Sequence, residues 1–163
     1  MKIALSLRLS SHRSSVAAFS LLEVMIAVMF IGLFISIGIP AFARVRENSV
    51  NAAAASTLLV FGDAFESYAR TNGDWPDDVP VGVVPPEMQG RINRVQWETP
   101  APGGGVWDWE CDRASGRVGI AIVGSLLALD EMVAIDALID DGNLAKGHFR
   151  RLPSGKPMWL LAE

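Results

Sequence analysis

The chain has 163 residues, a formal net charge of −4 and a hydrophobic content of 50%. After a leader and a membrane segment, this length leaves room for one small folded domain and excludes a second. The acidic balance, with no cluster of Lys and Arg residues, argues against nucleic acid as a partner. The single cysteine, Cys111, excludes an internal disulfide and is predicted to be a small buried hydrophobic residue.

Residues 1–18 form a basic leader that carries Lys2, Arg8 and Arg13 and no acidic residue. The segment 19–39 that follows contains no Lys or Arg, and as a helix it would be roughly 31 Å long, which matches the hydrocarbon core of a bilayer. A basic flank before this segment and an acidic chain after it predict a single pass with the N-terminus in the cytoplasm. A secretory signal would place its apolar segment before the small residues at 17–18, so we expect this segment to be retained.

One acidic residue, Glu23, lies inside the apolar segment, where a carboxylate costs on the order of 2.5–3.5 kcal/mol. If the mature chain began at Phe19, its amine would be positive and could neutralise Glu23 of a neighbouring subunit. The alternative is that Glu23 reaches the membrane interface without any partner.

The residues around Glu23 resemble the N-terminal motif of the type IV prepilin family. In that family a basic leader and a small residue precede Phe, Ser or Thr, Leu, Ile or Leu, and Glu; here Ala18 precedes Phe19, and residues 20–23 read Ser-Leu-Leu-Glu. The usual residue before the cut is Gly, so Ala18 departs from the pattern. The resemblance implies that a prepilin peptidase cuts between Ala18 and Phe19 and methylates Phe19. It also implies that Glu23, the fifth mature residue, acts in assembly.

Two further stretches carry a resemblance to the same family. Pro40 is the twenty-second residue from Phe19, where many members have a proline that kinks the helix; the alternative is that Pro40 ends the membrane helix of residues 19–40. Residues 72–76, Asn-Gly-Asp-Trp-Pro, resemble the exit of the long helix in type II secretion pseudopilins.

Together these resemblances imply a pilin-like structural subunit of a type II secretion pseudopilus, without enzymatic activity. Its implied partners are a prepilin peptidase, copies of itself and other pilin-like subunits, which it meets through its N-terminal helix. It would sit in the inner membrane with its C-terminal part in the periplasm, and then enter a periplasmic or surface filament. The alternatives are a minor type IV pilin, or an uncleaved single-pass anchor that presents a ligand-binding or sensor domain.

Beyond Pro40 the apolar residues of 41–72 recur at steps of three and four, which predicts an amphipathic helix that continues to about Thr71. Its polar side includes an i,i+4 pair, Glu66 with Arg70. Asn72-Gly73 predicts the helix end, and the prolines after it predict a loop of about 20 residues. The predicted inward face is Val50, Ala54, Leu58, Phe61, Phe65 and Tyr68, and the predicted outward face is Asn48, Asn51, Asp63, Glu66 and Arg70.

Alternation of apolar and polar residues in the remaining part, 73–163, predicts half-buried strands at 95–97, 107–111 and 118–122, joined as an antiparallel meander. A second helix is predicted over 129–141, with Met132, Ile135 and either Leu138 or Ile139 facing inward. Residues 148–152 and 156–161 are predicted to form a closing hairpin. The predicted fold is therefore α+β and pilin-like, with the long helix packed on a small antiparallel sheet.

Motifs for catalysis are missing from the sequence: it has no phosphate-binding glycine loop ending in Lys-Ser/Thr, no HExxH and no cysteine pair for zinc. His148 is interpreted as an exposed strand residue. Asp140, Asp141 and Asn143 offer hard oxygen ligands suitable for calcium, and two acids at a helix C-terminus are disfavoured by its dipole. The alternative is an ordinary solvated helix end, because the run lacks the distal Glu of an EF-hand loop. Calcium is therefore the one cofactor hypothesis, and no catalytic site is expected.

Overall fold

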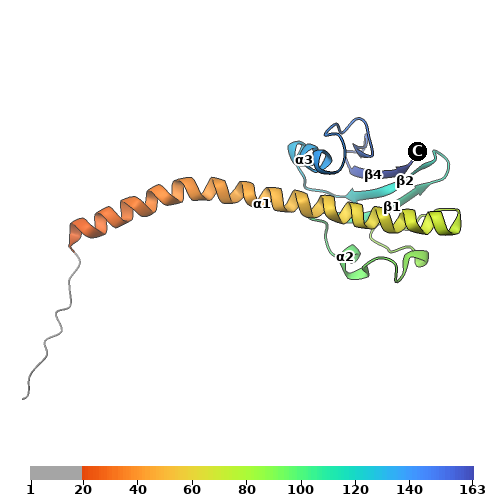
Figure 1. Cartoon of the computed structure of the whole chain (residues 1–163), viewed down its shortest axis with the longest axis horizontal. Helices are drawn as coiled ribbons and strands as arrows, with labels where there is room; N and C mark the ends of the chain where they lie inside the picture. The colour runs from red at the N-terminus through yellow and green to blue at the C-terminus, as the bar shows by residue number, and fades with distance from the viewer. Residues whose placement is uncertain (1–19) are drawn as a thin grey trace, which may run out of the picture. The chain divides into compact units, whose positions relative to one another are not determined.

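The computed structural model describes residues 20–163, so the predicted leader and cleavage site, at Ala18 and Phe19, lie outside the described part. The chain divides into two units, Met1–Ala41 and Phe42–Glu163, and the second is called the head below. The elements are α1 (Leu21–Asn72), a 3₁₀ turn η1 (Pro86–Met88), α2 (Arg94–Glu98), β1 (Val106–Asp112), β2 (Arg117–Val123), α3 (Leu129–Ile139), β3 (Phe149–Arg151) and β4 (Pro157–Ala162) (Figure 1).

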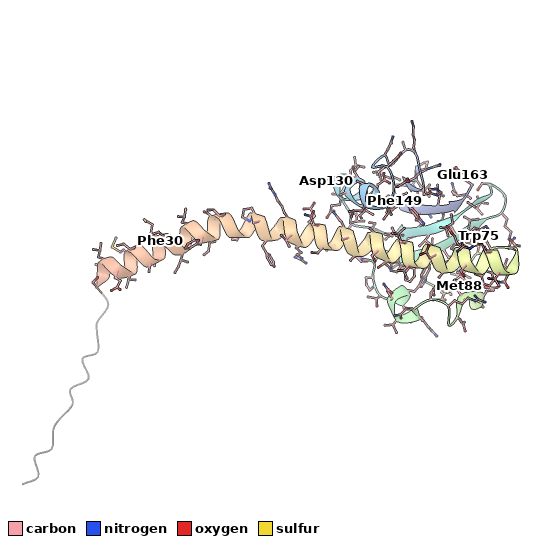
Figure 2. All side chains as sticks on the ribbon, in the orientation of Figure 1. Phe30, Trp75, Met88, Asp130, Phe149 and Glu163 are labelled. Atoms are coloured by element: carbon pink, nitrogen blue, oxygen red, sulfur yellow. The ribbon has the colours of Figure 1, made fainter. Side chains whose placement is uncertain are left out.

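The first turns of α1 are apolar and exposed. Ser20 begins the helix as its N-cap, since its Oγ accepts the backbone N–H of Glu23 at 3.2 Å. Every residue from Leu21 to Ala41 is exposed, and Phe30 projects from the helix with 48% of its surface accessible (Figure 2). This helix is long and apolar enough to cross a membrane.

Pro40 lies inside α1, which continues without a break to Asn72. The alternative that Pro40 ends the membrane helix is therefore wrong. The helix ends at Asn72, as the Asn-Gly pair predicted. Gly73 takes a φ of 78°, and its N–H donates to the carbonyl of Ala69 at 2.8 Å.

The second half of α1 buries most of the predicted apolar stripe, although Val50 at its start is only half-buried and lies outside the core. Leu58, Phe61 and Phe65 are at most 1% exposed, and Tyr68 is partly buried against the same core. The prediction that Asn51 lies on the polar side is wrong. Asn51 is only 2% exposed, and neither its side-chain oxygen nor its side-chain nitrogen has a hydrogen-bond partner. It lies one turn before Ala54 and Ala55, so it shares the stripe's side of the helix.

The four strands form one antiparallel sheet in the order β1-β2-β4-β3. Strands β1 and β2 occupy the predicted positions, with Trp109 opposite Ile120, and β3 and β4 form the predicted closing hairpin. The predicted three-strand meander is correct for its last two segments, which pair antiparallel as β1 and β2, and wrong for 95–97, which is not a strand. The final strand β4 pairs with β2. That pairing contains an irregularity between Val118 and Gly119.

Residues 95–97, predicted as a strand, belong instead to the short helix α2. Asn93 caps this helix by accepting the N–H of Gln96 at 3.3 Å, and Arg94 pairs with Glu98 one turn later at 2.6 Å. Two apolar residues spaced by two also fall on different sides of a helical turn. Val95 is accordingly 75% exposed, whereas Trp97 is fully buried.

Aromatic rings from α1, α2 and β1 form the centre of the head core. Phe65 stacks on Trp109 with ring centroids 3.9 Å apart, and Phe61 meets Trp107 edge to face at 5.4 Å. Trp97 of α2 reaches the same place, with its centroid 5.0 Å from that of Phe61. Three of the five tryptophans, Trp97, Trp107 and Trp109, are thus buried in this core to 1% exposure or less.

The second predicted helix is confirmed as α3, which buries Met132 and Ile135. Between the two remaining candidates, Ile139 packs partly buried against the core and Leu138 is 60% exposed. One burial was not predicted: Asp136, in the last turns of α3, has no exposed surface at all. This aspartate leads to the strongest candidate site in the head.

Candidate functional site

Three aspartates meet at the C-terminal end of α3. Asp136 is buried, Asp140 is half-buried and Asp141 is exposed, and one carboxylate oxygen of each lies within 4.8 Å of the other two. Residues 136 and 140 are four apart, so they share one face of the helix. The carboxylates therefore form a compact negatively charged group beside the negative end of a helix dipole.

The loop between α3 and β3 is held against this group by Asp140. Its Oδ2 accepts the backbone N–H groups of His148 and of Phe149, the latter at 3.1 Å. Gly147 makes the approach possible, since it has a φ of 75° and a Cβ there would overlap Asp140 Oδ2. Asp141 Oδ1 accepts the N–H of Asn143 at 2.8 Å. The two aspartates therefore fold the loop back on the helix end.

The charge of this group is not balanced by any side chain in residues 20–163. None of the ion pairs there includes Asp136, Asp140 or Asp141. Neither side-chain oxygen of Asp136 accepts a hydrogen bond within 3.5 Å. Burial first, and then the carboxylates of Asp140 and Asp141, raise the pKa of Asp136 to about 6, although the Asn143 backbone N–H lowers it.

The sequence had named Asp140, Asp141 and Asn143 as possible calcium ligands. The structure brings Asp140 and Asp141 together with Asp136, and the Asn143 side chain makes a different contact, accepting the N–H of Ala145 at 3.2 Å. The sequence analysis did not identify Asp136, because a single acidic residue in a mostly apolar helix is normally expected to be exposed. The signal that would have found it is the i,i+4 spacing of Asp136 and Asp140.

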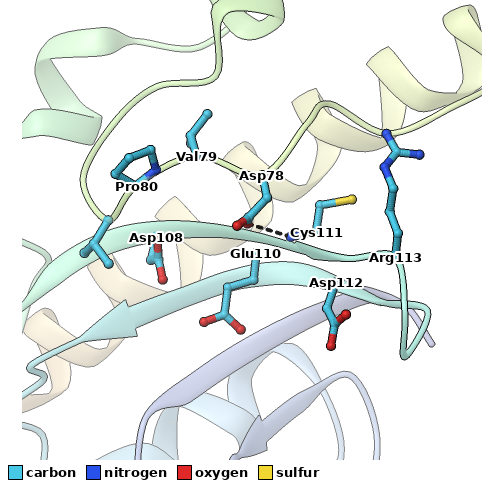
Figure 3. A pocket seen from close by; sticks show the side chains of 9 residues that line it. Asp78, Val79, Pro80, Asp108, Glu110, Cys111, Asp112 and Arg113 are labelled. Atoms are coloured by element: carbon cyan, nitrogen blue, oxygen red, sulfur yellow. Dashed lines mark hydrogen bonds between the residues drawn. The ribbon is translucent and has the colours of Figure 1, made fainter.

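A second candidate is an open groove of about 440 Å³ between β1 and the loop at residues 78–81 (Figure 3). Asp78 crosses it, and its Oδ1 accepts the backbone N–H of Cys111 at 3.1 Å. Asp108, Glu110 and Asp112 extend from one face of β1, while Cys111 lies on the other (Figure 3). Glu110 is paired with Lys156.

The electrostatics of this groove favour a structural role. Burial raises the pKa of the Cys111 thiol, which makes it a poor nucleophile, and the prediction that it is a buried residue is confirmed. Burial also raises the pKa of Asp108, with Lys156 acting against the shift. At the far end Arg113 binds Asp74 at 2.8 Å and Asp77 at 3.0 Å, and its hydrogen bond to Asp74 holds the pKa of that carboxyl below its usual value.

His148 lies just before β3 and is exposed. Its ring nitrogen Nδ1 is 2.9 Å from the carbonyl oxygen of Leu160, and its ring centroid is 5.5 Å from that of Trp159. These contacts join the two strands of the closing hairpin. The interpretation of His148 as an exposed strand residue is correct for its exposure, whereas the strand itself begins one residue later, at Phe149.

The predicted assembly residues, Glu23 and Pro40, both lie on α1 within the first unit. Glu23 is in the first turn, exposed, with its backbone N–H bound to the Ser20 hydroxyl. Pro40 is inside the helix and also exposed. Comparison of the chain with protein-family models, with curated proteins and with solved structures gave no match.

Proposed function

We propose that this protein is a pilin-like structural subunit of a type II secretion pseudopilus, anchored in the inner membrane with its head in the periplasm. A prepilin peptidase would cut before Phe19 and methylate it, and the mature chain would assemble with copies of itself and with other pilin-like subunits. The alternative is a minor subunit of a type IV pilus, which would be processed and assembled in the same way but in a different filament.

One observation carries this proposal: α1 exposes apolar side chains on all sides from Leu21 to Ile39, and Glu23 is the only charged residue among them. The one hydroxyl there, of Ser36, donates to the carbonyl of Leu33 within the helix. A helix that is apolar all round needs lipid or protein around it. An anchor needs only the apolar surface. A filament subunit would in addition need Glu23, because its carboxylate could pair with the N-terminal amine of Phe19 in a neighbouring subunit and so fix how the two helices align.

The cap at the start of α1 supplies a competing explanation for Glu23. Ser20 and Glu23 have the spacing of a capping box, and an acid in the first turn also interacts favourably with the helix dipole. Glutamine can replace glutamate in a capping box, but it carries no charge. Glu23→Gln therefore separates capping from charge pairing.

The test compares wild type, Glu23→Gln and Glu47→Ala in cells that have an active prepilin peptidase and assembly machinery. Glu47 is the matched control, an exposed acid on the same helix beyond the apolar segment. Intact-mass measurement of wild type should give a chain that begins at methylated Phe19. Sheared filaments should contain wild type and Glu47→Ala, and at least about tenfold less Glu23→Gln, since losing one buried charge pair costs several kcal/mol.

Two results would contradict the proposal. Wild-type protein that always keeps residues 1–18 would favour the uncleaved anchor with a ligand-binding head. Filaments containing Glu23→Gln at the wild-type level would assign Glu23 to capping or to the membrane interface.

A further inference from the structure

We propose that the head binds a guanidinium group on an aliphatic stem, in a groove beside Asp108 on the face of the sheet turned away from α1. This chemistry is shared by an arginine side chain of another protein and by a free alkylguanidine. The site lies wholly within the head and does not depend on the filament role, so either proposal can fail without the other.

The argument begins with the burial of Asp108 on β1. Its neighbours Trp107 and Trp109 pack on aromatic rings of α1, so Asp108 points to the opposite face of the sheet, on the same side as Glu110 (Figure 3). Only 5% of Asp108 is exposed, yet no hydrogen bond or ion pair within residues 20–163 uses its carboxylate. Buried carboxylates are normally paired, because an uncompensated charge is costly away from water. Asp108 therefore lacks the partner that its burial requires.

The side chains around Asp108 do not supply this partner. Ala121 lies opposite it on β2 and has no polar side-chain atom. Lys156 is close enough to act against the rise in the pKa of Asp108, but its ion pair is with Glu110. Asp78 is also close enough to affect this pKa, and it raises it. Three carboxylates therefore face one ammonium group, which leaves an excess of negative charge.

A groove gives a ligand access to the Asp108 carboxylate. It has a volume of about 600 Å³, and Val81, Asp108 and Glu110 line both this groove and the one drawn in Figure 3. Its second cation, Arg117, already pairs with Asp112 at 3.9 Å. A carboxylate beside apolar walls fits a cation at the end of a hydrocarbon stem. The apolar residues of the groove are Val81, Val123, Leu152 and Pro153.

The free carboxylate of Asp108 suits a guanidinium better than a metal ion or an ammonium group. Within residues 20–163, the three carboxylates close enough to share one metal ion are at the end of α3 and do not include Asp108. A carboxylate with two unoccupied oxygens can accept two parallel N–H bonds from a guanidinium. An ammonium is a more strongly hydrated point charge, so bringing it to a buried carboxylate costs more.

The experiment titrates the detergent-solubilised, ¹⁵N-labelled full chain with n-butylguanidinium or n-butylammonium and follows the backbone amide signals by NMR. The two probes have the same stem and charge and differ in the cationic group. Both should cause saturable shifts of the Asp108 and Ala121 amides. The guanidinium should bind at least about threefold more tightly, because it can form the bidentate contact.

Two variants and a matched control locate the binding site. Asp108→Asn keeps the shape of the side chain and removes its charge, so it should weaken binding of n-butylguanidinium at least about tenfold. Val81→Arg, at a half-exposed position in the groove wall, should also prevent binding, because it places a guanidinium of the chain itself in the groove. This variant decides the case in which Asp108→Asn does not fold. Asp130→Asn, an exposed acid on α3, should keep the wild-type affinity.

A pair of peptides distinguishes the two sources of the guanidinium. One is an acetylated and amidated peptide with a single arginine between alanines, and the other has citrulline, which is neutral and of similar size, in place of arginine. The citrulline peptide should bind at least about tenfold more weakly than the arginine peptide. An arginine peptide that binds more tightly than n-butylguanidinium would assign the site to a protein side chain. Equal or weaker binding would assign it to a free guanidinium compound.

Four outcomes would overturn the proposal. Absence of saturable shifts with both probes would mean that water or protonation satisfies Asp108. Equal affinities of the two probes would show that the groove attracts any cation. Wild-type affinity in Asp108→Asn or in Val81→Arg would place the ligand elsewhere. Weaker binding in Asp130→Asn would show that the total charge of the head, rather than this groove, attracts the probe.

Discussion

At the scale of single residues, the stability of the head depends on the aromatic side chains of α1. Phe61 is 1% exposed and lies between Trp97, at 5.0 Å, and Trp107, at 5.4 Å between ring centroids. Removing a buried Phe side chain typically costs about 3–5 kcal/mol, and a small domain has only about 5–15 kcal/mol in all. Phe61→Ala should therefore lower the Tm sharply in thermal unfolding followed by tryptophan fluorescence.

The control for this substitution lies on the same helix. Glu66 is partly exposed, with 42% of its side-chain surface accessible, and pairs with Arg70 at 3.6 Å, a contact worth about 0–1 kcal/mol. Glu66→Ala should leave the Tm nearly unchanged. Equal and small effects of the two substitutions would mean that the stripe packs against other subunits rather than against its own sheet.

At the scale of elements, the pairing of β2 with β4 leaves no room for a side chain at Gly119. A Cβ at this position would overlap the backbone oxygen of Trp159 and lie 2.9 Å from Met158 Cε. The backbone oxygen cannot move away without breaking the pairing of the two strands. Gly119→Ala should therefore destabilise the head by about 1–3 kcal/mol, measured by chemical denaturation.

Gly32→Ala supplies the matched control for Gly119→Ala. It adds the same methyl group, within α1, where no atom beyond the neighbouring residues and the backbone of the helix itself lies within 4 Å of the added carbon. We expect it to leave head stability unchanged. A Gly119→Ala variant as stable as this control would show that β4 can shift along β2, and the observed register would not be fixed by the glycine.

The sequence predicted those elements whose apolar period repeats several times. The stripe on α1, strands β1 and β2 and helix α3 each repeat their pattern over at least two turns or several alternations. The five-residue helix α2 does not, so Val95 and Trp97 were misread as a strand. The place of β4 beside β2 was not predicted either, because strand order depends on packing between distant segments. Of the three aspartates that meet at the end of α3, Asp140 and Asp141 were singled out from the sequence and the buried Asp136 was not.

At the scale of the whole molecule, the chain combines two units with opposite solvent requirements. In the first unit, the described residues 20–41 expose apolar side chains along the helix. The head, in contrast, buries its apolar residues around the tryptophans. The first buried residue of the head core is Asn51, and Ala54, Ala55 and Leu58 follow. None of residues 20–50 is buried, so they contribute nothing to the core. The head should accordingly fold without them.

Two truncations test this division. A chain of residues 46–163 keeps the whole core and should be soluble without detergent, with a Tm within about 4 °C of the full chain, which corresponds to about 1 kcal/mol or less. A chain of residues 61–163 loses Leu58 and the alanines before it, and the loss of one buried Leu alone costs about 2–5 kcal/mol. It should show no cooperative unfolding transition. If the first truncation failed to fold, the head would depend on residues 1–45. If the second melted like the first, the helix would not support the sheet.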